Sequence, residues 1–461
     1  MMCATRGGMS MDRRKFIIGM AGLAASSVAE ARPRGVRRMR REKLKVGILG
    51  VGMRGQVHLA ELLRRDDVAI TAVCDIDPFM IERALAQVEK AGQPKPAVYT
   101  GSPDAWQEML AKAGLDAVFI VTPWELHAPQ AIGAMRAKVA VACEVVAGIT
   151  LEDHWAVLRA QAETGTPYML LENVCYRRDV MAVLHMARQG LFGEIVHLEG
   201  GYQHDLRAVK FNAGIPGQAY GGGVEFGEKG WSEARWRTQH SVDRNGDLYP
   251  SHGIGPCAMQ ANINRGNRFL RLTSHASKAR GLNAYLAREA PDHPNAKTRF
   301  RLGDVVQTQI TCANGETILL SHDTSLPRPY SLGFRVQGTK GIWMDVNDSI
   351  YIEGQSPTPH RWEPDKAWLE RFDHPLWKRY APKAEGAGHG GMDFFVVHAF
   401  VEALKRAEPM PIDIYDAVAW SAITPLSEMS IADGNRTVDF PDFTDGAWKR
   451  RKPIFALDDR Y

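Results

Sequence analysis

The spacing of three glycines near the start of the chain predicts a binding site. Gly50, Gly52 and Gly55 form the pattern G-x-G-x-x-G, directly after an apolar run at residues 44–49 and directly before a helical pattern. In this setting the first glycine permits a tight turn, the second lets a diphosphate approach the backbone, and the third allows close packing of helix and strand. The start of the helix offers free N–H groups and the positive end of its dipole. The segment therefore predicts a dinucleotide site.

Asp75 indicates which dinucleotide is bound. It ends a second strand-like run at residues 68–74, at roughly the 20-residue distance at which a carboxylate binds the ribose hydroxyls of NAD. A carboxylate repels the 2′-phosphate of NADP, so the sequence favours NAD. The alternative interpretation is a glycine-rich turn that binds nothing.

Further polar side chains gather at the ends of predicted strands. They lie in five segments, at residues 122–127, 144–145, 172–176, 202–205 and 249–253. The first three are expected at one edge of a parallel sheet, where such sheets bind their ligands. Any one segment alone is more often structural, because a glutamate at a strand end usually caps a helix or pairs with arginine. The 15 histidines of the chain show no H-E-x-x-H pattern, so no metal site is predicted.

The elements that must position these residues begin with a Rossmann pattern. Strand and helix patterns alternate from residue 44 to about residue 171, and the apolar run 116–123 is typical of a strand buried in a parallel sheet. We therefore predict an α/β protein with an N-terminal Rossmann domain, a doubly wound parallel sheet, over residues 44–174.

The pattern of predicted elements changes in the remaining residues, 175–461. They predict an α+β domain with a largely antiparallel open sheet, whose expected strands lie at 195–201, 269–276, 304–312, 317–322, 332–337 and 350–353. Residues 214–245 are predicted to form a long loop of the kind retained for a site. Two closing helices are expected, at 392–406 and 414–431. Packing of these helices on the Rossmann domain, and a homo-oligomer formed through the open sheet, are alternatives that the sequence leaves open.

A targeting segment is expected at the N-terminus. Arg13 and Arg14 precede a short apolar stretch at residues 16–29, and A-E-A at 29–31 fits a cleavage site. This predicts a twin-arginine signal over residues 1–31 and a basic lead-in over 32–43. The twin-arginine translocase is then a partner, and the periplasm or the outside medium is the expected location. A retained anchor is less favoured, because the stretch is short and rich in glycine and alanine.

Charge and cysteine content argue against two other classes of protein. The formal net charge is +4, and the basic cluster at residues 32–45 has no interleaved aromatic residues. It is typical of a solvated tail rather than a nucleic-acid surface. The six cysteines form no C-x-x-C pair, so neither a disulfide framework nor a zinc site is predicted.

Longer motifs resemble known families. The glycine segment, Thr-Pro at 122–123 and Glu-Val at 144–145 resemble the broad glucose–fructose oxidoreductase and inositol dehydrogenase family. More narrowly, four motifs are similar to glycoside hydrolase family 109: E-N-V-C-Y-R-R-D at 172–179, G-G-Y-Q-H-D-L-R at 200–207, Y-P-S-H-G at 249–253 and N-I-N-R-G-N-R-F at 262–269. The resemblance implies an NAD-dependent α-N-acetylgalactosaminidase, and many members are exported by the twin-arginine route. The chain departs from the family at V-A-G (146–148), where Pro-Ala is usual after Glu-Val, and at Ser251, where threonine is usual.

The resemblance also implies roles for individual residues. The implied NAD contacts, beside the three glycines, are Met53, Arg54, Asp75, Trp124, His127, Glu144, Val145 and Asn173. The implied sugar contacts are Tyr202, Arg237, Tyr249, His252 and Tyr330. Arg237 is the weakest match, because Arg235 lies beside it in the predicted loop. The predicted catalytic residues are Tyr202, His252 and Glu172.

The valine at position 145 indicates the mechanism that the resemblance implies. Sugar dehydrogenases of the broad family have here the lysine of Glu-Lys-Pro, which assists removal of a hydroxyl proton. Valine cannot take a proton, whereas Tyr202 and His252 can. Oxidation of the sugar's C3 hydroxyl acidifies the C2 proton, and loss of that proton expels the C1 group. Water then adds, and the hydride returns to C3. This oxidation–elimination–addition–reduction cycle hydrolyses a terminal α-N-acetylgalactosamine with no net redox change, and NAD stays bound throughout.

Two other functions remain as alternatives. One is an exported NAD(P)-dependent sugar oxidoreductase of the glucose–fructose oxidoreductase type, which Val145 disfavours. The other is a binding or sensing protein that retains NAD without catalysis, which the intact segment at 249–252 disfavours.

Overall fold

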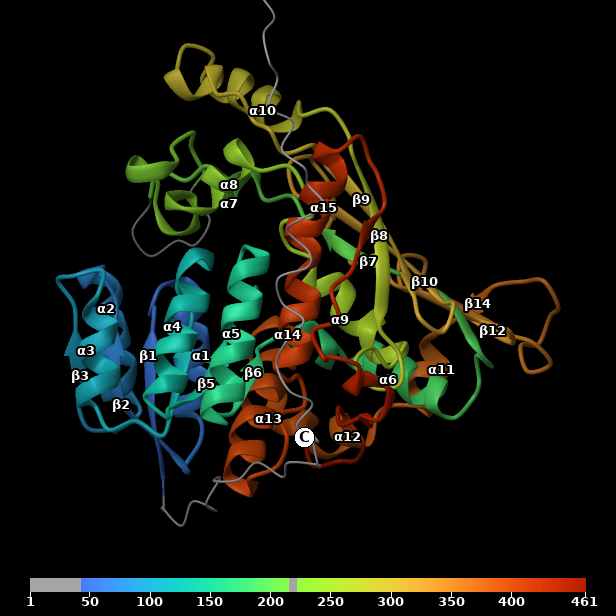
Figure 1. Cartoon of the computed structure of the whole chain (residues 1–461), viewed down its shortest axis with the longest axis horizontal. Helices are drawn as coiled ribbons and strands as arrows, with labels where there is room; N and C mark the ends of the chain where they lie inside the picture. The colour runs from blue at the N-terminus through green and yellow to red at the C-terminus, as the bar shows by residue number, and fades with distance from the viewer. Residues whose placement is uncertain (1–42, 215–221) are drawn as a thin grey trace, which may run out of the picture. The chain divides into compact units, whose positions relative to one another are not determined.

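The first sheet has six parallel strands. The computed structural model describes residues 43–214 and 222–461, so the predicted signal and nearly all of the lead-in lie outside the described residues. The strand order is β3-β2-β1-β4-β5-β6, which is the order of a doubly wound dinucleotide-binding fold. The predicted parallel sheet is thereby confirmed (Figure 1). The strands are β1 (Leu44–Leu49), β2 (Val68–Cys74), β3 (Ala97–Tyr99), β4 (Ala117–Ile120), β5 (Ala140–Cys143) and β6 (Tyr168–Leu170).

The burial of this sheet explains its sequence pattern. Every residue of β4 is buried, and Phe119 pairs in register with Ile48 of β1. A strand covered on both faces has no solvated side, so its apolar residues run continuously instead of alternating with polar ones. The helices of this part of the chain are α1 (Met53–Leu63), α2 (Pro78–Lys90), α3 (Ala105–Lys112), α4 (Trp124–Arg136) and α5 (Leu151–Thr164).

The second sheet has nine strands in the order β14-β13-β12-β11-β7-β10-β9-β8-β15. Its neighbouring strands run antiparallel except for β7 and β10, which are parallel, so the predicted largely antiparallel sheet is confirmed. Gly315 has φ +103° in the turn between β9 and β10, a conformation that favours glycine. The strands are β7 (Ile195–Gln203), β8 (Phe269–Ala276), β9 (Val305–Cys312), β10 (Thr317–Asp323), β11 (Arg335–Gly338), β12 (Gly341–Met344), β13 (Ser349–Ile352), β14 (Glu363–Pro364) and β15 (Val438–Asp439).

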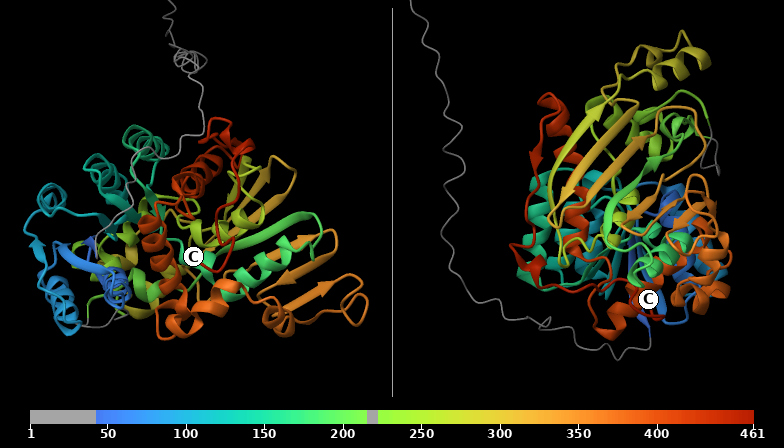
Figure 2. Two further views of the ribbon diagram at one scale, coloured as in Figure 1. Left: turned by 90° about the horizontal axis from the view of Figure 1, so that it is seen from below. Right: turned by 90° about the vertical axis from the view of Figure 1, so that its right-hand side faces the viewer.

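One face of this sheet is open over β10, β9 and β8, toward the β15 edge. Among the described elements, no helix lies in front of β8, β9 and β10 in the right-hand view of Figure 2. Gln307 and Gln309 of β9 are exposed there, whereas their neighbours Val306 and Thr308 are buried. This alternation is typical of a sheet with one solvated face.

The second part of the chain contains more helix than the sequence predicted. Its helices are α6 (Arg178–Arg188), α7 (Arg207–Lys210), α8 (Arg237–Asp243), α9 (Ser251–Gln260), α10 (Gly281–Glu289), α11 (Lys366–Arg371), α12 (Pro375–Ala384), α13 (Met392–Arg406), α14 (Ile414–Ser421) and α15 (Ile423–Ala432). The prediction of one helix over 414–431 is wrong, because the helix is interrupted at Ala422, between α14 and α15. Pro425 explains the break, since its ring clashes with the carbonyl of residue 421 and it lacks an N–H donor.

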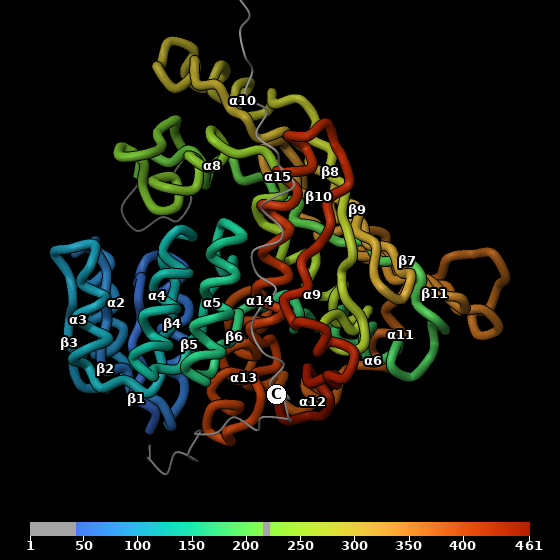
Figure 3. The backbone as a smooth tube through the Cα atoms, viewed as in Figure 1, coloured from blue at the N-terminus to red at the C-terminus, as the bar shows by residue number. Residues whose placement is uncertain are grey.

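The predicted long loop at 214–245 is also wrong in part. Its described residues include the 3₁₀ turns η3 (Gly227–Lys229) and η4 (Ser232–Arg235) and the helix α8. Phe226, near its start, packs on the buried rings of Phe211 and Phe300. Phe211 and Phe300 lie outside the segment, so these contacts stabilise turns that its own glycine-rich sequence does not indicate. Figure 3 shows this segment, in green, lying beyond the ends of α4 and α5.

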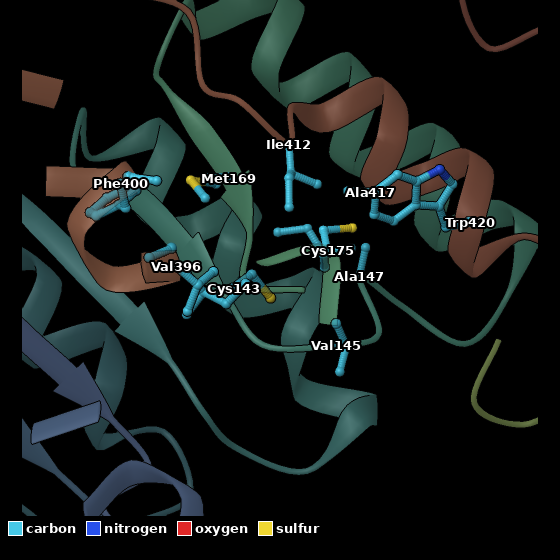
Figure 4. Close-up of a cluster of buried hydrophobic side chains, with 14 of the residues drawn as sticks. Cys143, Val145, Ala147, Met169, Cys175, Val396, Phe400, Ile412, Ala417 and Trp420 are labelled. Carbon is cyan, nitrogen blue, oxygen red and sulfur yellow. The ribbon is translucent and has the colours of Figure 1, made fainter. Parts of the chain in front are cut away.

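The C-terminal helices pack on the Rossmann sheet. Phe400 of α13 contacts Phe119 of β4 edge to face, with ring centroids 5.4 Å apart. Figure 4 shows Met169 beside Phe400, and Trp420 of α14 in the same buried cluster. Across residues 43–214 and 222–461, every helix is too short or too polar to cross a membrane.

Candidate active site

A single cavity of about 430 Å³ collects most of the predicted site residues. It lies at the carboxyl ends of the parallel strands, and residues of the second part of the chain complete its wall. Of the predicted residues, only Gly55 and Glu172 do not line it. The predicted residues that do line it are Gly50, Gly52, Met53, Arg54, Asp75, Trp124, His127, Glu144, Val145, Asn173, Tyr202, Arg237, Tyr249, His252 and Tyr330.

The glycine turn has the shape that a diphosphate requires. Gly50 has φ +84°, and a Cβ there would lie 2.5 Å from the Val121 carbonyl oxygen. A Cβ on Gly55 would lie 2.1 Å from the carbonyl oxygen of Gly50, so Gly55 serves packing behind the turn. Gly52 instead faces open space and caps α1 without any side-chain hydrogen bond. The first N–H groups of α1 are therefore open to an anion in the cavity.

Asp75 completes the features that fit NAD. Its Oδ2 accepts the Val51 N–H at 2.7 Å and its Oδ1 accepts the Asp77 N–H at 2.9 Å. These bonds fix the carboxylate at the cavity wall, and each oxygen keeps a second lone pair for a ribose hydroxyl. Burial raises the pKa of Asp75, and the two backbone N–H donors oppose that shift.

A buried ion-pair network forms the floor of the cavity beside α1. Arg54 contacts Glu144 at 2.6 Å and binds both oxygens of Asp393 at 2.9 Å. Asn173 donates to Asp393 at 2.8 Å, and His58 lies 2.6 Å from Glu144. Burial alone would raise the pKa of Glu144, but Arg54 and His58 offset it and hold that pKa well below its usual range. The network fixes Arg54, Glu144 and Asn173 from three separate segments.

His127 joins two strand ends. Its Nδ1 lies 2.6 Å from the Val146 carbonyl oxygen and its Nε2 lies 2.7 Å from the Thr122 carbonyl oxygen. Both ring nitrogens are therefore occupied by backbone. His127 fixes the cavity wall, and a contact between its side chain and NAD stays a prediction.

Three aromatic rings and Arg237 form the opposite side of the cavity. The Arg237 guanidinium lies over the rings of Trp124, Tyr202 and Tyr249, with distances of 5.2, 5.9 and 5.0 Å to their centroids. Glu233 pairs with Arg237 from one helical turn earlier. A planar cation held over aromatic faces gains both cation–π attraction and a fixed direction for its N–H groups. Both Arg235 and Arg237 line the cavity, but only Arg237 is buried, whereas Arg235 is exposed.

Glu172 lies behind His252 and does not reach the cavity. Its carboxylate is fully buried, accepts the Val174 N–H at 3.0 Å, and lies 2.8 Å from Nδ1 of His252. Because Nδ1 donates to the carboxylate, Nε2 is the nitrogen that remains for chemistry in the cavity. This geometry favours a positioning role toward His252, and the predicted catalytic role of Glu172 stays a prediction.

Tyr202 lies between His252 and two further site residues. Its ring is 5.2 Å from the ring of His252 and 4.7 Å from that of Tyr249. The Tyr202 hydroxyl lies 3.3 Å from Nδ1 of His204. The His204 ring in turn contacts Tyr330, which is half exposed at the mouth of the cavity. Tyr202 and His252 thus present two proton-carrying groups to one space.

Sequence reasoning missed several residues of this cavity. The residues concerned are His204, Glu233, Trp236, His389 and the buried Asp393 behind them. His204 and Glu233 stand next to predicted residues, so a closer reading of the segments around Tyr202 and Arg237 could have found them. His389 and Asp393 contact Arg54, which lies more than three hundred residues earlier in the chain. Nothing local in the sequence indicates that pairing.

The fold and the cavity define a class: a Rossmann protein that binds NAD beside an aromatic pocket for a second, polar ligand. Residues 44–171 match the model of an oxidoreductase family with an NAD-binding Rossmann fold. Residues 176–450 match the model of the glycosyl hydrolase 109 C-terminal domain. The chain belongs to glycosyl hydrolase family 109, as its motifs predicted.

Relatives agree with this assignment, and a solved structure shares the fold. The chain is 64% identical over 456 residues, 98% of its length and 100% of the relative's, to a glycosyl hydrolase family 109 protein of Stenotrophomonas maltophilia (strain K279a). It is 48% identical over 470 residues, 97% of its length and 100% of the relative's, to an alpha-N-acetylgalactosaminidase of Tannerella forsythia. A levoglucosan dehydrogenase solved with NADH and levoglucosan is similar with a TM-score of 0.64 at 19% identity, over 87% of this chain and 100% of that one. That likeness concerns the fold alone.

Proposed function

We propose that this chain hydrolyses terminal α-N-acetylgalactosamine residues and uses NAD as a bound cofactor. The observation that carries the proposal is the shared cavity, in which the glycine turn and Asp75 face the same space as Tyr202 and His252. The relative of Tannerella forsythia named for this activity supports the substrate. The NAD-binding domain supports a catalytic cycle that uses NAD. Position 145, where sugar dehydrogenases of the broad family have lysine, is valine here, and this also supports that cycle.

The glycine turn, the start of α1 and Asp75 would hold NAD, which when bound supplies a reversible hydride acceptor for a sugar hydroxyl. The residues of the chain must then manage the protons. Val145 is buried and has no titratable atom, so proton transfer falls to Tyr202 and His252. We assign the acceptance of a proton from the sugar to His252 Nε2, since Glu172 occupies Nδ1. The Tyr202 hydroxyl, next to His204, is placed to exchange a proton with a sugar hydroxyl.

The remaining wall residues orient the sugar. Arg237 can donate to a hydroxyl or to the carbonyl oxygen of an N-acetyl group while its face stays over Tyr249. Tyr330 lies at the mouth, where it can close over the ligand. A mechanism with these residue roles needs no pair of facing carboxylates. Glu172 lies too deeply buried to be one of such a pair.

The test is a panel of aryl glycosides assayed with no added NAD, together with quantification of nucleotide released from the purified protein. Release of aryl alcohol from the α-N-acetylgalactosaminide, with bound NAD near one per chain and no growth of NADH absorbance, is the expected result. Steady accumulation of NADH would replace this proposal with a sugar oxidoreductase. Turnover by a nucleotide-free protein would also contradict it.

We also infer that the chain is exported by the twin-arginine route to the periplasm or beyond. The support is the sequence alone, namely Arg13 and Arg14 before a short apolar stretch and an A-x-A site at 29–31. Folded export suits a protein that acquires a cytosolic cofactor. Fractionation of cells that express the wild type or the Arg13→Lys/Arg14→Lys double variant tests this inference. Equal export of both would contradict it.

A further inference from the structure

His389 lies at the cavity wall next to the start of α1. Its Nδ1 is 2.7 Å from Asp393 Oδ2 and 3.3 Å from Nη1 of Arg54, a residue in the first turn of that helix. The side chain is 55% exposed and lines the same cavity as Gly52 and Met53. Because Nδ1 faces Asp393, Nε2 is the ring nitrogen left to face the cavity.

The chain is shaped to hold His389 at this point. The backbone at Gly388 lies against Asp393, since a Cβ there would come within 2.2 Å of its Oδ2. His389 itself has φ +51°, and Gly390 and Gly391 have φ +66° and +99°. Asp393 has no exposed side-chain surface and also accepts hydrogen bonds from Arg54 and Asn173. A glycine-rich turn from the second part of the chain is therefore fixed over the first turn of α1.

The local charge favours a further hydrogen-bond donor to the diphosphate here. Arg54 is the cation of this floor, but it is paired with two carboxylates, Glu144 and Asp393. His58 contacts Glu144 at 2.6 Å, and burial lowers its pKa. The floor thus carries a net negative charge beside the helix start at which the diphosphate of a dinucleotide binds. Among the described residues that line the cavity, the other two arginines, Arg235 and Arg237, belong to the aromatic side.

We propose that His389 is an NAD-binding residue. Its Nδ1–H donates to Asp393, its positioning residue, and its imidazolium form donates Nε2–H to the diphosphate. The contact would come from the C-terminal part of the chain, outside the Rossmann domain. It would help to retain the cofactor between turnovers. The inference rests on the proposed use of NAD as a bound cofactor, but it concerns binding and can be tested without any sugar.

The experiment measures release of NAD from the holoenzyme by exchange against isotopically labelled NAD. His389→Asn is the informative variant, because asparagine tolerates positive φ and keeps a short donor toward Asp393 while losing the outward N–H. The loss of one charge-assisted hydrogen bond is expected to speed release about 10- to 100-fold. The ³¹P resonances of bound NAD are expected to shift in the same variant.

His360→Asn is the matched control, since His360 is exposed, has φ +60° and does not line the cavity. It is expected to leave NAD release and the ³¹P spectrum unchanged. His389→Gln, which places an amide N–H near the former Nε2, is expected to recover part of the retention. Wild-type release rates and phosphorus resonances in His389→Asn would overturn the inference and leave the proposed glycosidase intact. A wild-type protein without bound NAD would instead contradict the proposed function itself.

Discussion

One ring nitrogen of His252 faces both carboxylate oxygens of Glu172, with Nδ1 2.8 Å from Oε1 and 2.9 Å from Oε2. The carboxylate has no exposed surface, whereas His252 lines the cavity. A buried anion behind an imidazole fixes its tautomer and stabilises the imidazolium that forms when the outer nitrogen accepts a proton. The pair therefore has the arrangement of a general base and its positioning residue.

His252→Ala and Tyr202→Phe are each expected to lower kcat by roughly 10²–10⁴-fold, because each removes a group that transfers a proton. Bound NAD is expected to remain, since neither side chain belongs to the glycine turn or to the Arg54 network. Steady-state kinetics and nucleotide quantification on the same preparations provide the measurement. Loss of NAD or of the folded state in these variants would make the two residues structural.

Glu172→Gln separates positioning from direct catalysis. Glutamine can still accept the Nδ1–H of His252 but carries no charge, so kcat is expected to fall while KM changes little. The loss should be equal for aryl glycosides with good and poor leaving groups, because Glu172 acts through His252. The ¹H resonance of the His252 Nδ1 proton is expected to move upfield in the variant. A loss confined to poor leaving groups would return Glu172 to the role of a proton donor.

Arg237→Lys tests the aromatic side of the cavity. Lysine keeps the charge but loses the planar group that lies over Trp124 and Tyr249. We expect KM for the N-acetylgalactosaminide to rise about tenfold, since one stacked, directional contact is worth roughly 1–2 kcal/mol. Arg299→Lys, at an exposed position that does not line the cavity, is the control and should bind substrate like the wild type. Equal effects of the two substitutions would contradict the assignment.

Asp75→Asn is expected to weaken NAD binding about 10- to 100-fold, because it removes a charged acceptor for ribose hydroxyls. It should also reduce the preference for NAD over NADP, since the repulsion of the 2′-phosphate is lost. Retention of NAD by the purified variant, and exchange with labelled NAD and NADP, measure both effects. An unchanged NADP discrimination would show that another residue excludes the 2′-phosphate.

Asp247 predicts a dependence of stability on pH. Burial raises its pKa from 3.8 to about 7, and its carboxylate accepts the N–H of Tyr249. Because the folded-state pKa lies above the unfolded one, the folded protein binds the proton more tightly, and this stabilisation is complete below about pH 4 and lost by about pH 7. Asp247→Asn keeps an acceptor for Tyr249 but cannot ionise. The melting temperature of the variant should therefore exceed that of the wild type at pH 8, and the difference should vanish near pH 4.

The two sheets illustrate what the sequence could predict. The continuous apolar run through Phe119 and the glycine spacing at Gly50 are local signals, and both led to the correct Rossmann topology. Family motifs placed Tyr202, Arg237, Tyr249 and His252 before any geometry was known, and these residues do line one cavity. The motifs do not indicate how deeply a side chain is buried, however, and the fully buried Glu172 was therefore predicted among the catalytic residues.

Contacts between distant segments could not be predicted from the sequence. Arg54 and Asp393 form a bidentate ion pair across most of the chain, and neither has a neighbouring residue that indicates the other. Such a pair depends on how α13 packs on α1, which hydrophobic periodicity alone does not specify. His389 was missed for the same reason, since its glycine-rich turn is typical of any surface loop.

Isotope incorporation tests whether the sugar's C2–H bond breaks in every catalytic cycle. If His252 Nε2 or the Tyr202 hydroxyl takes the C2 proton, that proton exchanges with solvent, and turnover in D₂O should place deuterium at C2 of the released sugar. A substrate deuterated at C2 is expected to react more slowly, and one without the C3 hydroxyl should not be cleaved, because it has no hydride to transfer. A glycosidase with two facing carboxylates never breaks this bond and would release sugar with its original C2 hydrogen. In His252→Ala, deuterium incorporation during residual turnover would show that another group can take the C2 proton. Formation of NADH on the protein without exchange at C2 would assign that proton to His252. Full retention of the C2 hydrogen by the wild type would refute the elimination mechanism for any substrate.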